Sequence, residues 1–125
     1  MEALPLVLLV DDSTMVTDAL RVLFESTGHR VAVAADVSSA IDACAVALVD
    51  VMLLDLSLGS EDGLDVLPVV REAGTAPRVT YAMTGHDDPA TRRRCLDAGC
   101  RDVLVKPVPT RELLRRVSEA AGGDK

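Results

Sequence analysis

The chain has 125 residues, of which 49% are apolar and 26% are charged. This composition excludes a largely disordered chain, and the length suits one compact domain. The formal net charge of −7 argues against nucleic-acid binding by the domain as a whole. No apolar run reaches the about 18 residues of a membrane span, and no basic flank precedes an apolar stretch at the N-terminus. We therefore expect a cytoplasmic protein without membrane association.

Five short apolar runs mark the expected strands, at residues 6–10, 31–34, 51–54, 79–83 and 103–105. Most of them show no alternation of apolar and polar residues. Continuous apolar runs of this length indicate strands that are buried on both faces, as in a parallel sheet covered by helices.

Helical spacing of apolar residues fills the segments between these runs. The first helix follows Ser13 and ends before Gly28, and another begins at an Asp88 cap with Pro89 at its first position and ends at Gly99. The segments 38–45 and 64–72 have weaker spacing. Because Pro68 lacks an N–H group, we expect the latter helix to begin close to Pro68 or to bend there.

The last helix is marked by an apolar stripe of Leu113, Leu114, Val117 and Ala121. Strand and helix therefore alternate five times, which predicts an α/β three-layer sandwich with right-handed crossovers. We expect a single domain over residues 1–125, with its core at about 5–118 and a tail or cut linker at 119–125. The cysteines Cys44, Cys95 and Cys100 are expected to be free thiols that fill the core as small apolar groups.

Polar residues follow four of the five apolar runs directly. Asp11 and Asp12 follow the first, Asp55 the third, Thr84 the fourth and Lys106 the fifth. In an open parallel sheet the carboxyl ends of the strands share one edge, where ligands bind. If the first and third strands are neighbours, about 4.8 Å apart, three carboxylates meet there.

Three close carboxylates repel one another unless a cation neutralises them. Oxygen ligands without Cys or His suit a hard ion such as Mg²⁺. With the ammonium of Lys106 and the hydroxyl of Thr84, the set suits a phosphoryl group passing to or from a carboxylate. Taken singly, an Asp after a strand is more often a turn or cap residue, but four strand ends carrying complementary groups favour a site.

The motifs at these strand ends resemble those of bacterial response-regulator receiver domains, the phosphoacceptor modules of two-component phosphorelays. The resemblance covers about residues 6–117, with the motifs in the family's order. The matching motifs are Asp11-Asp12, the loop from Asp55 to Asp62-Gly63, Met83-Thr84-Gly85 and Val105-Lys106-Pro107.

The resemblance implies a flavodoxin-like three-layer sandwich with five helices around a five-stranded parallel sheet in the order 2-1-3-4-5. It implies that Asp55 is phosphorylated by a phosphohistidine on a sensor histidine kinase or a histidine phosphotransfer protein. In such a module, which catalyses only its own phosphorylation and dephosphorylation, Lys106 and Thr84 contact the phosphoryl oxygens. Asp12, Asp55 and the backbone carbonyl of Ser57 ligate Mg²⁺, and Asp11 acts mainly through water. The family also implies a cis peptide bond between Lys106 and Pro107.

The sequence departs from the family pattern at a few positions. Gly59 replaces a proline in the phosphoacceptor loop, and Gly85 replaces an alanine. Val103 replaces a Tyr or Phe whose ring moves inward on activation, and Tyr81 on the adjacent strand is expected to be a core ring. We therefore expect any signal to travel through the loop and the fourth helix. His86, like Ser57, occupies a position that tunes the lifetime of the phosphoryl group in the family.

Eight of the thirteen basic residues lie between Arg92 and Arg116. They mark the face formed by the fourth helix, fifth strand and fifth helix. The cluster favours either a docking face for an acidic partner or a second copy of the chain, or a solvated face that offsets the acidic site.

Three other functions compete with a free-standing phosphorylatable receiver. The chain could be a receiver excised from a hybrid histidine kinase or a larger regulator. It could also be a degenerate receiver that acts only as an interaction module, although the intact strand-end residues argue against this. A phosphatase of the haloacid-dehalogenase class would need a second Asp where Ser57 stands.

Overall fold

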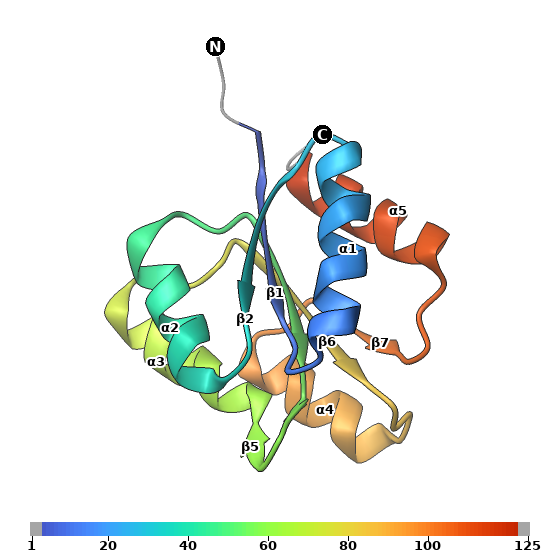
Figure 1. The fold of residues 1–125 in the computed structure, drawn as a ribbon. Helices are drawn as coiled ribbons and strands as arrows, with labels where there is room; N and C mark the ends of the chain where they lie inside the picture. The colour runs from blue at the N-terminus through green and yellow to red at the C-terminus, as the bar shows by residue number, and fades with distance from the viewer. Residues whose placement is uncertain (1–3, 123–125) are drawn as a thin grey trace.

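The computed structural model describes residues 4–122. Within this range, five parallel strands form one sheet in the order β2-β1-β3-β6-β7, which confirms the expected order once a short hairpin is set aside (Figure 1). The elements are β1 (Leu6–Val10), α1 (Thr14–Ser26), β2 (Arg30–Ala34), α2 (Val37–Val46), β3 (Val51–Asp55), β4 (Ser57–Leu58), β5 (Glu61–Asp62), the 3₁₀ turn η1 (Gly63–Asp65), α3 (Val66–Ala73), β6 (Val79–Thr84), α4 (Pro89–Ala98), β7 (Asp102–Val105) and α5 (Thr110–Ala121).

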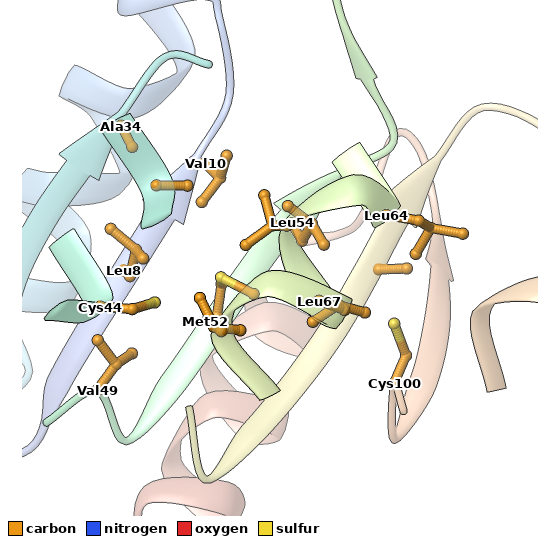
Figure 2. Packing of buried hydrophobic residues seen from close by; sticks show 14 of the residues in the cluster. Leu8, Val10, Ala34, Cys44, Val49, Met52, Leu54, Leu64, Leu67 and Cys100 are labelled. Atoms are coloured by element: carbon orange, nitrogen blue, oxygen red, sulfur yellow. The ribbon is translucent and has the colours of Figure 1, made fainter. Parts of the chain in front are cut away.

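Two apolar clusters cover the two faces of the sheet. Alternate residues of β1 point to opposite faces, so that Leu8 packs with α2, α3 and α4 while Leu9 packs with α1 and α5. Figure 2 shows the first cluster, in which Met52 and Leu54 of β3 lie among residues of α2 and α3. The helices therefore form two layers with the sheet between them.

The expectation that the strands are buried on both faces holds for β1, β3 and β6, whose residues are all buried. It is wrong for β2, where Arg30 and Val33 are exposed. Residues of β2 are exposed because this strand, like β7, lies at an edge of the sheet. Only the central strands are covered along their whole length by helices.

The starts of α1 and α4 and the end of α4 lie where local signals placed them. The Ser13 side chain accepts a hydrogen bond from the Val16 N–H, and Asp88 accepts one from Thr91 at 2.7 Å. Gly99 ends α4 in the left-handed region at φ 112°. Pro68 is the third residue of α3, within the first turn, where its missing N–H would have no helical partner in any case.

Two features of the chain differ from expectation. Residues 119–121, expected to begin a tail, are the last residues of α5, and Ala120 is buried; residues 123–125 lie outside the described range. The hairpin β4–β5 was not predicted. Its two-residue turn contains Gly59 at φ 64°, a backbone angle closed to the proline that the family carries there.

The described residues contain no helix that is long and apolar enough to cross a membrane. Cys44, Cys95 and Cys100 are buried free thiols, as expected. The peptide bond between Lys106 and Pro107 is cis, as the resemblance implied.

Candidate functional site

Three carboxylates meet at the carboxyl edge of the sheet. Asp55 ends β3, and Asp11 and Asp12 follow the neighbouring β1. One oxygen from each residue lies within 4.8 Å of the other two. Asp11 and Asp55 are only 4% and 5% exposed, whereas Asp12 is open to solvent. The structure thus brings together the three acidic residues that the sequence singled out.

Lys106 supplies a positive charge to this acidic cluster from the residue after β7. Its Nζ lies 2.7 Å from Oδ2 of Asp55 and 3.6 Å from Oδ2 of Asp11. Its backbone N–H donates to the carbonyl of Thr84 at 2.7 Å, which ties the lysine to the end of β6. Burial works against the charged ammonium, but the hydrogen bonds and negative charges of Asp55 and Asp11 outweigh it and raise the pKa of Lys106.

One buried oxygen of the cluster has no hydrogen-bond partner among the described residues. Oδ1 of Asp11 accepts the Ser13 N–H at 2.9 Å, but Oδ2 is buried and unpartnered, since Lys106 is too far away for a hydrogen bond. Burial raises the pKa of Asp11, and the nearby charges of Asp55 and Asp12 add to the effect. A buried carboxylate oxygen beside two more carboxylates fits a hard divalent cation.

The loop after Asp55 is held close to that residue by backbone contacts. The Ser57 N–H donates to Oδ1 of Asp55 at 3.1 Å, and the Gly63 N–H donates to the carbonyl of Leu56 at 2.9 Å. A Cβ on Gly63 would lie 2.1 Å from the carbonyl oxygen of Asp55, so no side chain fits there. The family motif Asp62-Gly63 therefore has a packing cause that the sequence alone did not reveal.

Thr84 lies at the carboxyl end of β6, is 5% exposed and lines a cavity of about 270 Å³. Its Oγ1 accepts the His86 N–H at 3.1 Å. The cavity lies between the loop after Asp55 and α4, and its walls include Ser57, His86, Thr91 and Arg94. The hydroxyl, the loop and the start of α4 therefore share one space.

Two side-chain contacts of this loop were missed by the sequence reasoning. The Asp62 carboxylate accepts a hydrogen bond from Arg94 of α4 at 2.5 Å. The adjacent Glu61 accepts one from the Val37 N–H at the start of α2, at 2.9 Å. The hairpin is thus fastened to helices on both sides. The partners are 32 and 24 residues apart, so no local pattern marks them.

Val103 and Tyr81 lie on opposite faces of the sheet. Val103 is buried in the cluster beneath α2, α3 and α4, whereas Tyr81 packs with α1 and α5. The guanidinium carbon of Arg116 lies 5.8 Å from the centre of the Tyr81 ring. Tyr81 is a core ring, as expected, and it does not take the place of the aromatic residue missing at Val103.

The basic cluster of α4, β7 and α5 is largely paired within the chain. Asp102 accepts hydrogen bonds from Arg92 at 2.7 Å and from Arg116 at 2.9 Å. On α5, Glu112 pairs with Arg115 and Arg116. This face is therefore a network of both signs rather than a continuous positive surface.

Comparisons with known proteins agree on one family. A family model described as the response regulator receiver domain matches residues 7–118. The transcriptional regulatory protein KdpE of Mycobacterium tuberculosis is 35% identical over 115 residues, which cover 92% of this chain and 50% of KdpE. CpxR of Escherichia coli, another transcriptional regulatory protein, is 33% identical over 111 residues, covering 89% and 47% of the two chains.

A solved structure of the receiver domain of a Francisella response regulator superposes with a TM-score of 0.87 at 26% identity, covering 97% of this chain and 99% of that one. This chain spans about half the length of the curated relatives it matches. The family match over 7–118, the identity to KdpE and CpxR and the shared fold lead to one conclusion: the chain belongs to the response regulator receiver domain family.

Proposed function

We propose that this receiver domain accepts a phosphoryl group on Asp55 in an Mg²⁺-dependent reaction, from a phosphohistidine of a sensor histidine kinase or a histidine phosphotransfer protein. The observation that carries the proposal is the contact between Asp55 and Lys106 beside the unpartnered Oδ2 of Asp11. A structural ion pair alone would not require a third carboxylate at Asp12.

The residues of the site would take distinct parts in the transfer. A carboxylate oxygen of Asp55 forms a bond to phosphorus as the bond from phosphorus to the histidine nitrogen breaks, which yields an acyl phosphate. Lys106 and the Thr84 hydroxyl stabilise charge on the phosphoryl oxygens. Asp11, Asp12, Asp55 and the Ser57 carbonyl would hold Mg²⁺, which when bound offsets the negative charge of the carboxylates and the incoming phosphoryl group.

Labelling with a small phosphodonor tests this function directly. We expect Mg²⁺ and the donor to add the mass of one phosphate to the wild-type protein, and we expect the addition to be lost in Asp55→Asn or in excess chelator. Asp18→Asn, which alters an exposed carboxylate of α1 outside the cluster, is the matched control. Equal labelling of Asp55→Asn and wild type would exclude Asp55 as the acceptor. No labelling of wild type would favour a receiver that acts only as an interaction module.

The face of α4, β7 and α5 is the proposed output surface, for a downstream protein or a second copy of the chain. Within residues 4–122, Arg111 of α5 is exposed and takes part in no ion pair, so it is available to an acidic partner. Binding through it should weaken as salt rises. That the domain itself binds no nucleic acid remains a prediction, since the relatives named as transcriptional regulators are about twice as long.

A further inference from the structure

Within residues 4–122, one ion pair joins the phosphoacceptor loop to α4. Arg94 reaches from α4 to Oδ2 of Asp62, and the two side chains are 55% and 41% exposed. Arg94 and Asp62 also line the cavity that Thr84 shares with the loop. The ion pair therefore bridges the space between the two segments that surround the phosphorylation site.

Asp62 transmits this contact to Asp55 through the backbone. Its Oδ1 accepts the Leu64 N–H at 3.0 Å while Oδ2 is held by Arg94, so both oxygens are engaged. The cap on Leu64 holds the turn in which Gly63 lies directly against the carbonyl oxygen of Asp55. A displacement of Asp62 therefore reaches Asp55 through Gly63, the next residue along the chain.

Two other connections join the site to α4: the backbone after Thr84, and the apolar cluster that contains Leu64 of the loop and Cys95 of α4. Residues 85–88 link Thr84 to the first turn of α4, whereas Arg94 contacts the loop from the second half of the helix. Val103 offers only a short buried side chain beneath α4, in the same cluster as Cys95. Among the described residues, the Asp62–Arg94 pair is the polar side-chain contact that joins the loop to the body of α4.

We propose that Arg94 is a positioning residue that acts through Asp62: it holds the phosphoacceptor loop in its reactive register and couples α4 to the state of Asp55. This inference rests on the proposed phosphorylation of Asp55 and adds its regulation. Because coupling between binding equilibria is reciprocal, a partner that binds α4 through Arg94 would in turn change the phosphorylation equilibrium.

The size of the effect follows from the exposure of the pair. Exposed ion pairs change an equilibrium by at most about fivefold. We expect Arg94→Ala to slow labelling of Asp55 by a small phosphodonor about two- to fivefold. Arg93→Ala removes the same charge from the adjacent position of α4 without touching the loop, and it should leave the rate unchanged. Arg94→Lys should retain most of the wild-type rate.

Asp62→Asn separates positioning from attraction of the donor. This variant keeps the positive charge of Arg94 and the amide oxygen that can cap Leu64, but it removes the ion pair. If Arg94 only attracted the anionic donor, releasing it would speed labelling. Positioning through Asp62 instead predicts slower labelling, and it predicts that the double variant Asp62→Asn/Arg94→Ala is no slower than the slower single variant.

Amide hydrogen exchange in α4 distinguishes coupling from a purely structural role of Arg94, which would not alter the response of α4. Beryllofluoride with Mg²⁺ should change amide exchange in α4 of wild type and of Arg93→Ala, and this response should be lost in Arg94→Ala at a similar thermal midpoint. The coupling would be overturned if Arg94→Ala and Arg93→Ala had the same labelling rate and the same amide exchange in α4. It would also be overturned if the losses in labelling rate of Asp62→Asn and Arg94→Ala multiplied in the double variant. If wild type takes up no phosphate on Asp55, the proposed function itself fails; if it labels normally and the variants match, only the role of Arg94 fails.

Discussion

Gly63 lies directly against the carbonyl oxygen of Asp55, at a distance that leaves no room for a Cβ. The contact fixes the end of the loop after Asp55 onto Asp55 itself. The backbone angle of Gly63 is not in the left-handed region, so the constraint at this glycine comes from space and not from conformation.

Gly63→Ala is therefore expected to be costly for both stability and chemistry. The methyl group meets backbone that cannot rotate away, and the overpacking should cost about 1–3 kcal/mol in free energy of unfolding. Labelling of Asp55 should fall sharply because the loop must shift. Gly85→Ala is the control, since a Cβ there meets nothing within 4 Å. Urea unfolding and phosphate mass measure the two effects, and equal stability of the two variants would contradict the packing argument.

Binding of Mg²⁺ should stabilise the protein through the acidic cluster. A site that binds only the folded state adds about 2.7 kcal/mol when the free ion is at about 100 times its Kd. Asp12→Asn should lose most of this gain. In chelator, the same variant should equal or exceed wild type in stability, because the charge of Asp12 adds to the repulsion at buried Asp11.

Thermal unfolding with and without MgCl₂ measures this difference. Asp18→Asn, outside the cluster, should respond to the ion as wild type does. An equal Mg²⁺ response in Asp12→Asn would show that the ion binds elsewhere on the chain.

The stabilising role of Asp102 should depend on pH. Burial works in the opposite direction, but hydrogen bonds from the Val103 N–H, Arg116 and Arg92 hold the pKa of Asp102 below its usual range. A carboxyl whose pKa is lowered by folding contributes stability that is present above its unfolded pKa of about 3.9 and is lost as the pH falls through the folded value.

Asp102→Asn should accordingly cost about 1–2 kcal/mol at neutral pH and little in strong acid. Asp97→Asn, an exposed residue of α4, should stay within about 0.5 kcal/mol of wild type throughout. Urea unfolding of each variant and of wild type, from neutral pH to strong acid, measures these differences in free energy of unfolding. A cost for Asp102→Asn that does not shrink in acid would rule out ionisation as its source.

The cysteines should resist thiol reagents in the folded protein. Burial raises the pKa of Cys44, Cys95 and Cys100, the last to about 12. At pH 8 fewer than about one Cys100 thiol in a thousand is ionised, and the thiolate is the reactive form. Time-resolved labelling should show slow reaction in buffer and rapid reaction of all three in urea. Fast native labelling at any of them, located by mass spectrometry, would show a local opening of the core.

Local signals predicted the starts of α1 and α4 and the end of α4, because each signal acts within a few residues. Ser13, Asp88 and Gly99 all satisfy backbone groups of the helix that they border. The exposure of β2 could not be predicted in this way, since an apolar run does not reveal whether its strand has one neighbour or two. The convergence of Asp11, Asp55 and Lys106 could be predicted from the sequence, because the ends of parallel strands share one edge of the sheet.

The contacts of the loop after Asp55 could not be predicted from the sequence. Asp62 and Arg94 are separated by 32 residues, and either charge alone is ordinary on a surface. The hairpin β4–β5 is only two residues per strand, too short for an alternating pattern to show. The opposite orientations of Tyr81 and Val103 depend on strand register, which only the paired strands define.

The place of Tyr81 gives the molecule an intrinsic optical probe. The sequence contains no tryptophan, one tyrosine and one phenylalanine, so excitation beyond the absorption band of phenylalanine gives emission from this ring alone. Arg116 of α5 lies over the ring while the ring itself is fixed on β6. Emission should therefore respond to a change in the packing of α5 on the sheet, without any attached dye. A change in this emission on phosphorylation would mark movement in the layer of α1 and α5, on the face of the sheet opposite α4.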